Sequence, residues 1–442
     1  MHHLRRGRRG AAACLISAAL LATGCVPSVP RQEIAPPGTV ASGTIEFWHF
    51  FTDREADAIQ QVVNAFEAKY PQVKVIVKAG QDDDKTTQAI GAGQGPDVDL
   101  SGTTDNVGQF CSTGAWQDLT PYIARDNVDL TDIPQTVQAY TAYEGRRCTM
   151  PLLADAYGLY YNKKLFAAAG ISGPPKTLTE LADDAKKLTE RNADGSFKTI
   201  GFDPLSGYYE NSVGHLVTMA GASWLDQDGR STIGTDPEFK KMLQWQRSMI
   251  DFYGFANLQR FQAGFGDEFS ADNAFEKGQV AMNVDGEWRI ASIAADEPAD
   301  LDWGVAPLPM ADDRPNLYGS GFVVGNVIGI SRNTKNAEAA WQFIKFLTTN
   351  TESVVALSNA IKNVPTLNSA LKSPTLTADA NFKTFIDVFA NPRSTTSPLS
   401  ANGTAYQDTA QTFVDDWQAG KVKNLDAGLR GLDDEINQAL DG

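Results

Sequence analysis

The sequence is poor in cysteine and histidine, with four of each among 442 residues. A catalytic Gly-x-Ser-x-Gly elbow, a His-Glu-x-x-His helix, a phosphate-binding glycine loop and internal repeats are all absent from it. These absences argue against a repeat protein, a zinc-stabilised domain and several common enzyme classes. The formal net charge of -16 also argues against nucleic acid as a partner and favours neutral or zwitterionic ligands.

The first 24 residues have the layout of a secretory signal peptide, because four arginines precede an uncharged apolar run over 11–22. That run is too short for a permanent membrane helix. Thr23 and Gly24 before Cys25 resemble the lipobox of bacterial lipoproteins, although Ala22 stands where Leu is commoner. The resemblance implies an acylated Cys25 on the extracytoplasmic face of the cell membrane, with 25–43 as a proline-rich tether. The alternative is an ordinary signal peptide followed by an incidental cysteine.

Two cysteines, Cys111 and Cys148, remain in the body of the chain. In an exported protein we expect them to form a disulfide, with two separate buried thiols as the alternative. Two cysteines cannot by themselves build a structural zinc site, and we expect neither a metal site nor a cofactor.

Strand and helix patterns alternate along the roughly 400 residues after the tether. A strand over 44–50 is followed by a helix in which Thr52 and Glu55 have capping-box spacing. A strand over 73–77, a short helix and a strand over 97–101 come next. This order predicts an α/β fold with a largely parallel sheet, and the length predicts two lobes.

Five stretches, in order, carry a resemblance to a known family. They begin at Ile45-Glu46-Phe47-Trp48-His49, Gly93-Gln94-Gly95-Pro96-Asp97, Pro151-Leu152-Leu153-Ala154-Asp155, Phe275-x-x-Gly278-Gln279 and Ala306-Pro307-Leu308-Pro309. The chain resembles the family 1 extracellular solute-binding proteins of carbohydrate and glycerophosphodiester ABC importers. Among these it most resembles the actinobacterial and mycobacterial sugar-binding lipoproteins of the Usp and Ugp type.

The resemblance implies a two-lobed periplasmic-binding-protein fold of type II around a ligand cleft. Lobe one would comprise 44–155 and 306–350, and lobe two 156–305 and 351–442. The implied function is capture of a carbohydrate, such as an amino sugar or short oligosaccharide, for the transmembrane subunits of an ABC permease. The protein would act as a monomer without catalysis and would meet the membrane only through its lipid. A glycerophosphodiester-binding subunit is the alternative, and a secreted glycoside hydrolase a remote one.

Sugar hydroxyls bind carboxylates and amides, and the apolar faces of sugar rings pack on aromatic side chains. Asp155 matches an acidic ligand contact of maltose-binding relatives, with Tyr157 two residues further along the same strand. Trp288 matches an aromatic platform of the same relatives, beside Asp285 and Glu287. The alternatives are a hinge carboxylate at Asp155, core packing for the two rings and solvated loop positions for the two acids.

Further candidates follow from strand ends and from loops of the family. In α/β folds the carboxyl ends of strands face the ligand crevice. Residues at the end of the strand over 97–101 and at the end of the first strand are therefore candidates for ligand contacts. The complete further set is Trp48, His49, Asp53, Ser101, Thr104, Asp105, Tyr208, Tyr209, Asn211, Gly319, Ser320 and Arg393. Ser101 stands where the maltose-binding relative has a tryptophan, so one platform is missing. Helix capping, loop packing and a surface arginine are the alternatives for this set.

Overall fold

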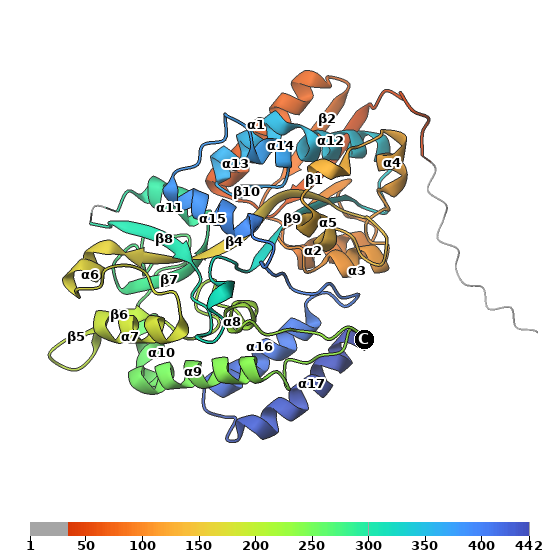
Figure 1. Cartoon of the computed structure of the whole chain (residues 1–442). Helices are drawn as coiled ribbons and strands as arrows, with labels where there is room; N and C mark the ends of the chain where they lie inside the picture. Colours follow the sequence, from red (N-terminus) through yellow and green to blue (C-terminus); the bar gives the residue numbers. More distant parts are fainter. Residues whose placement is uncertain (1–33, 299, 442) are drawn as a thin grey trace, which may run out of the picture. The chain divides into compact units, whose positions relative to one another are not determined.

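The computed structural model describes residues 34–298 and 300–441, and those from Pro36 onward form one compact unit. The signal segment and Cys25 lie outside the described residues. Ten strands pair in one sheet (Figure 1): β1 (Gly43–His49), β2 (Val73–Lys78), β3 (Val98–Ser101), β4 (Met150–Asn162), β5 (Glu190–Arg191), β6 (Phe197–Phe202), β7 (Val280–Gly286), β8 (Trp303–Pro307), β9 (Val323–Ile330) and β10 (Val364–Pro365).

Helices connect these strands and cover the sheet. In the first half they are α1 (Asp53–Lys69), α2 (Asp83–Gly91), α3 (Val107–Ser112), α4 (Thr120–Arg125), α5 (Gln135–Tyr140), α6 (Lys163–Ala168), α7 (Leu178–Leu188) and α8 (Val213–Ala220). In the second half they are α9 (Pro237–Tyr253), α10 (Phe255–Gln262), α11 (Arg289–Asp296), α12 (Ala337–Thr349), α13 (Thr351–Ile361), α14 (Asn368–Leu371), α15 (Ala380–Ala390), α16 (Ala405–Gln418) and α17 (Leu425–Asp441). None of these helices is long and apolar enough to cross a membrane.

The sheet is mixed, which corrects the expectation of a largely parallel one. Its order is β2-β1-β3-β9-β4-β7-β6-β5, with β8 and β10 also paired to β4. Parallel pairing is confined to β1–β2, β1–β3 and β6–β7, while β9, β4, β8 and β10 pair antiparallel. The expectation came from the first three strands, which follow the simple strand–helix–strand rule. Strand β4 has the same direction as these three, whereas β6 to β10 run the opposite way.

Strand β4 joins the two parts of the sheet. Its first half, Met150 to Ala156, pairs with β9, and its second half, from Tyr157 or Gly158 to Tyr161 or Asn162, pairs with β7 and β8. Every residue of the strand except Tyr161 is buried. Such a near-continuous apolar run is typical of a strand covered on both faces.

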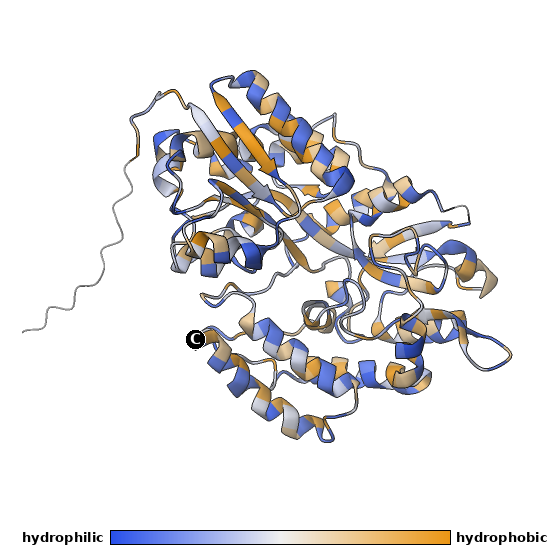
Figure 2. Cartoon of the chain, turned by 180° about the vertical axis from the view of Figure 1, so that it is seen from behind, coloured by the Kyte–Doolittle hydropathy of each residue, from blue (hydrophilic) through white to orange (hydrophobic). Residues whose placement is uncertain are grey.

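Helix α1 shows how the apolar pattern places one face against the sheet. Ile59, Val62, Val63 and Phe66 are buried. Figure 2 shows helices on which hydrophobic and hydrophilic residues alternate, as expected for helices with one face against the core. The predicted capping box does not form, because Thr52 makes no side-chain bond to the helix. Glu55 instead pairs with Arg54 at 3.1 Å.

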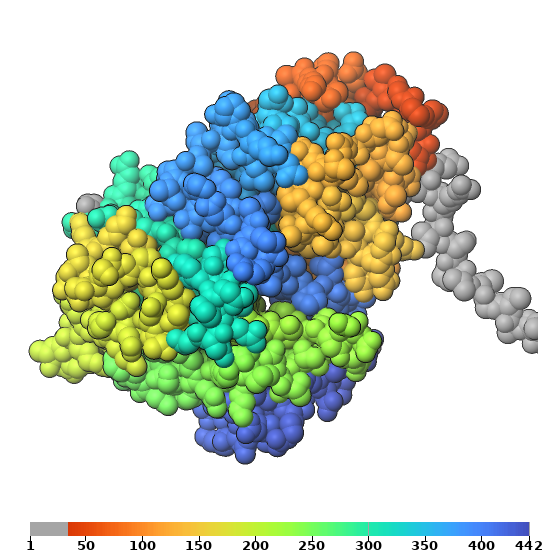
Figure 3. All heavy atoms as spheres, in the orientation of Figure 1, coloured from red at the N-terminus to blue at the C-terminus, as the bar shows by residue number. Residues whose placement is uncertain are grey.

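Contacts between distant parts of the sequence hold the fold together. The Cys111 and Cys148 sulfurs form a disulfide with Cα atoms 5.4 Å apart, in agreement with the expected pairing. Ser369 donates to the carboxylate of Asp132 from its backbone nitrogen (2.8 Å) and its hydroxyl (2.6 Å). Figure 3 shows blue segments of the last third of the chain beside orange segments of the first third. Helix α13 packs against α1, so residues after Thr351 return to the side of the first strands.

Candidate ligand-binding cavity

A cavity of about 430 Å³ lies where β4 and β9 meet the loops after β1, β3 and β7. This volume falls within the roughly 300–1,000 Å³ that small-molecule pockets occupy. Its lining contains eight ring-bearing side chains, four carboxylates, two asparagines and several small residues. They are Phe50, Phe51, Glu55, Gly102, Thr103, Asp105, Asp155, Tyr157, Tyr209, Glu210, Ser212, His215, Phe269, Trp288, Phe322, Val324, Asn326, Asn363 and Gln407.

Asp155, on β4, is one of the four carboxylates of the lining. Its carboxylate accepts hydrogen bonds from the amide nitrogens of Asn326, at 3.3 Å, and Asn363. Burial raises the pKa of Asp155 to about 7, and the two amide donors only partly offset that effect. The buried amide oxygens of both asparagines have no hydrogen-bond partner among the described residues. Each asparagine thus has one unused acceptor next to the Asp155 carboxylate.

Aromatic rings surround Tyr157, which follows Asp155 on the same strand face. The Tyr157 ring lies 4.3 Å from His215, 5.5 Å from Trp288 and 5.8 Å from Phe322, measured between centroids. Tyr157, His215 and Phe322 are all buried, and Trp288 is half-buried. These rings form an apolar inner wall on which a sugar face can pack.

His215 is a polar group that this aromatic wall encloses. Its Nδ1 lies 3.0 Å from the Ser212 hydroxyl, and its Nε2 is buried without a partner among the described residues. Burial lowers the pKa of His215 to about 3, so the imidazole is neutral at physiological pH. The Nε1 of Trp288 is likewise buried and unpaired among the described residues. Buried polar atoms are rarely left unpaired, so both nitrogens are unusual features of residues that line the cavity.

The electrostatic character of the cavity is acidic. Glu55, Asp105, Asp155 and Glu210 line it, whereas no lysine or arginine belongs to the described lining. Burial raises the pKa of Glu210 to about 7, with a further contribution from the charge of Asp285. Asp155 is buried, the other three acids are half-buried, and of the four Glu55 has a cationic partner in Arg54. Carboxylates gathered in this way favour either bound protons or a cationic ligand.

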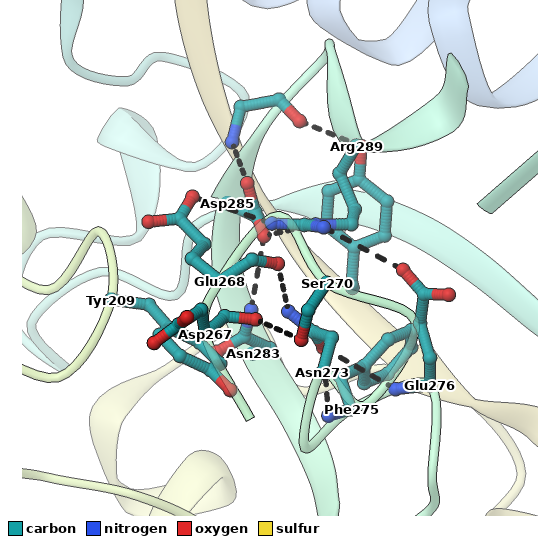
Figure 4. Close-up of polar contacts among 12 residues, drawn as sticks. Tyr209, Asp267, Glu268, Ser270, Asn273, Phe275, Glu276, Asn283, Asp285 and Arg289 are labelled. Atoms are coloured by element: carbon teal, nitrogen blue, oxygen red, sulfur yellow. Dashed lines mark hydrogen bonds and ion pairs between the residues drawn. The ribbon is translucent and has the colours of Figure 1, made fainter. Parts of the chain in front are cut away.

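Asp285 and Glu287 lie behind the cavity wall. Figure 4 shows Asp285 bound to Arg289, with Asp285 Oδ2 at 2.7 Å from Arg289 Nε. Glu287 accepts from the backbone nitrogen of Ala156 at 2.9 Å. Both carboxylates are fully buried. Glu287 therefore ties the end of β7 to β4, Asp285 holds Arg289 at the start of α11, and neither acid belongs to the described lining.

Other predicted residues also lie outside the lining. Trp48 bonds Glu46 beneath Lys78, Ser101 donates to Asp83 at 2.7 Å, and Ser320 donates to the Leu317 carbonyl at 2.6 Å. Tyr208 stacks on Tyr209 at 4.4 Å, and Asn211 donates to the Asp203 carbonyl at 2.9 Å. The rest are His49 and Thr104, which are buried, Gly319, which is half-buried, and Asp53 and Arg393, which are exposed.

The cavity thus brings together Asp105, Asp155, Tyr157, Tyr209 and Trp288 from the predicted set. Sequence reasoning missed His215, Phe269, Phe322, Asn326 and Asn363. Phe322 directly follows Gly319-Ser320-Gly321, so the predicted loop ends next to a residue of the cavity lining. No local signal distinguishes the two asparagines, because only the pairing of β9 and β10 with β4 brings them to Asp155.

A mixed α/β body with one acidic, ring-lined cavity is the architecture of a small-molecule binding protein. The chain belongs to the bacterial extracellular solute-binding proteins, whose family model matches residues 52–353. It is 27% identical over 342 residues to the maltotriose-binding protein of Pyrococcus abyssi, covering 76% of this chain and 70% of the relative. It is 26% identical over 349 residues to the diacetylchitobiose-binding protein of Streptomyces coelicolor, covering 75% of this chain and 76% of the relative.

Solved structures show the same fold. The mannotriose-bound structure of the protein CpMnBP1 has a TM-score of 0.79 at 25% identity, covering 89% of this chain and 99% of the other. The sugar-binding protein MalE of Xanthomonas citri has a TM-score of 0.72 at 22% identity, covering 90% and 98%. The fold is accordingly the two-lobed, maltose-binding-protein-like type II fold of periplasmic binding proteins, as the sequence predicted.

Proposed function

We propose that the protein is the substrate-binding subunit of an ABC importer and that it captures a carbohydrate without chemical turnover. The observation that carries this proposal is the wall around Tyr157, where aromatic rings lie beside unpaired buried polar atoms. The rings would pack against the apolar faces of a sugar, and the unpaired polar atoms would form hydrogen bonds with its hydroxyls. The sugar-binding relatives support the same ligand class.

The ligand we favour carries an amino group, as an amino sugar or a short oligosaccharide of amino sugars. Four carboxylates line the cavity and no lysine or arginine does so among the described residues. A protonated amine would supply the positive charge that this lining lacks, through charge-assisted hydrogen bonds. Asp155 and Glu210 are the preferred partners for that amine.

The remaining parts of the proposal concern delivery. Acylation of Cys25 would hold the protein at the extracytoplasmic face, and the 25–43 tether would let a monomer reach the transmembrane subunits of the permease. The lobes would divide near residues 155 and 306, with the cavity between them. Kinship to lipoproteins of the Usp and Ugp type belongs to this proposal as well.

Two alternatives make different demands on the cavity. A glycerophosphodiester carries a phosphate, which calls for arginine, lysine or a group of backbone N–H donors. Arg393 would be the predicted source, but it is exposed and lies outside the lining. A glycoside hydrolase would need two carboxylates on either side of the scissile bond, and incubation with oligosaccharides would reveal cleaved products.

Calorimetry with glucosamine, N-acetylglucosamine, glucose and glycerophosphocholine tests the choice among these ligands. We expect binding of glucosamine that is at least about tenfold tighter than that of its acetylated or neutral counterparts, since one charge-assisted bond is lost in each. Equal affinities for the three sugars would contradict the role of the amine but not sugar capture. Binding of glycerophosphocholine alone would replace the proposal with the alternative.

A further inference from the structure

Phe269 is an exposed aromatic residue at the edge of the cavity. The large apolar side chains that are exposed in the described residues are Val40, Ile76, Phe252 and Phe269, and only Phe269 among them lines the cavity. Its side chain is 65% exposed, whereas Tyr157, His215 and Phe322 in the inner wall are below 8%. The cavity therefore has a buried aromatic inner part and a solvent-exposed aromatic outer part.

The loop that carries Phe269 is closed by the hydroxyl of one tyrosine. Tyr209 donates from its hydroxyl to the Gly266 carbonyl at 2.8 Å and accepts from the Ala274 nitrogen at 3.1 Å. These two contacts join the ends of the 266–274 loop. A Cβ at Gly266 would lie 2.5 Å from the Asp272 carbonyl oxygen, so the two ends approach too closely for a side chain there.

Further hydrogen bonds fix the loop internally. Asn273 donates from its amide to the Glu268 carbonyl at 2.8 Å, and Ser270 donates from its hydroxyl to the Asp267 carbonyl at 2.8 Å (Figure 4). The backbone nitrogen of Ser270 also donates to the Asp267 carbonyl, at 3.0 Å. The loop is therefore ordered by its own contacts and does not depend on burial of Phe269.

Arg289 connects this loop to the end of β7, behind the cavity wall. Its side chain is 1% exposed and contacts Asp285 at 2.7 Å, Glu268 at 3.3 Å and Glu276 at 3.5 Å. The guanidinium carbon also lies 5.3 Å from the centre of the Phe269 ring. Arg289 directly follows Trp288 in the sequence. The same buried cation therefore contacts the loop of Phe269 and adjoins the tryptophan of the inner wall.

When a ligand packs on an exposed ring of an ordered loop, no conformational entropy is spent on ordering that loop. Removal of the apolar ring surface from water then favours binding. We propose that Phe269 is a specificity-determining residue, which packs against the second ring of a two-ring saccharide while the inner wall holds the first. Tyr209 and Arg289 are positioning residues for its loop. This inference rests on the proposed function, since it takes the ligand to be a saccharide.

The test uses three matched pairs of one-ring and two-ring probes in calorimetry with the purified protein. The pairs are mannose and mannobiose, glucose and maltose, and glucosamine and its β-1,4-linked dimer. Phe269→Ala should weaken binding of the two-ring member about tenfold and of the one-ring member by less than about twofold. Phe269→Trp should restore the two-ring affinity, because it restores a packing surface.

Control variants separate this role from a general effect on folding. Phe252→Ala removes an aromatic ring that is 41% exposed on α9, away from the cavity, and should change neither affinity. Tyr209→Phe keeps the ring but removes the hydroxyl that joins the loop ends, and should reduce two-ring affinity selectively. A selective loss in that variant would not follow from a purely structural role of Tyr209.

Unchanged two-ring affinity in Phe269→Ala, or an equal loss for both members of a pair, overturns this inference and leaves sugar capture intact. Failure of the unaltered protein to bind any of the six saccharides overturns the proposed function and this inference together.

Discussion

The ring of Trp288 stands perpendicular to that of Tyr157, with centroids 5.5 Å apart and an angle of 89° between the planes. This edge-to-face pair joins β4 to the loop after β7 in the wall of the cavity. Edge-to-face packing fixes a ring more tightly than burial alone. The Trp288 face is thus oriented before any ligand arrives.

Replacing Trp288 should weaken sugar binding without unfolding the protein. We expect Trp288→Ala to cost about 1–3 kcal/mol of binding free energy, measured by calorimetry, because packing and one N–H contact are both lost. Trp303→Ala is a matched control, since Trp303 is also half-buried but stacks on Tyr160 outside the cavity. Equal losses in the two variants would contradict a platform role for Trp288.

Gly286 should be intolerant of any side chain because the Trp288 ring occupies the space beside it. A Cβ at Gly286 would lie 2.1 Å from that ring, so Gly286→Ala must displace the tryptophan. We expect weaker ligand binding together with a lower melting temperature. Gly431→Ala, at a helix position where a Cβ meets nothing within 4 Å, should leave binding unchanged and raise stability slightly. Undiminished binding in Gly286→Ala would show that Trp288 has another position available.

The unliganded protein should become less stable as the pH rises from about 4 to about 7. The pKa of Asp155 is raised to about 7 by burial, so the folded protein holds a proton that the unfolded chain releases near pH 4. Folding then binds protons across this window, and stability is lost as the pH increases. Thermal melts of Asp155→Asn between pH 5 and pH 8 should show a shallower slope, since that proton uptake is removed.

An exposed acid on α1 supplies the comparison for that measurement. Asp57→Asn should retain the slope of the unaltered protein, because Asp57 lies in solvent on the outer face of the helix. If both variants reduce the slope equally, the pH dependence arises from overall charge and not from the cavity.

Reduction of the disulfide should lower stability considerably. Cys111 and Cys148 close a segment with a sequence separation of 37 residues, for which chain-entropy arguments give about 4 kcal/mol. Adding dithiothreitol should therefore lower the melting temperature of the unaltered protein. A variant carrying Cys111→Ala and Cys148→Ala should melt lower from the outset and respond no further. Identical melting with and without reductant in the unaltered protein would show that the pair is not oxidised in solution.

The local elements of the fold could be predicted from the sequence, but the contacts between distant segments could not. Alternation in β1 and β2 and the apolar face of α1 are properties of neighbouring residues, so they were visible. The antiparallel entry of β9 beside β3 depends on where the chain returns after some two hundred residues, which no local pattern records.

The same division applies to the candidate site. Asp155, Tyr157 and Trp288 were found because they lie in recognisable stretches near strands that meet. Asn326, Asn363 and His215 reach the cavity only through tertiary packing. Conversely, Asp285 and Glu287 have the chemistry of ligand contacts but are taken up by Arg289 and by the backbone of Ala156.

The shared strand β4 has a mechanical consequence. Its partners change between Ala156 and Tyr157, so a rotation of one half of the sheet against the other would have its fulcrum beside Asp155 and Tyr157, which line the cavity. A sub-ångström adjustment there is magnified with distance from the fulcrum. A dye attached far from β4, on α17 for example, would therefore report on ligand occupancy with a larger signal than one placed next to the sugar.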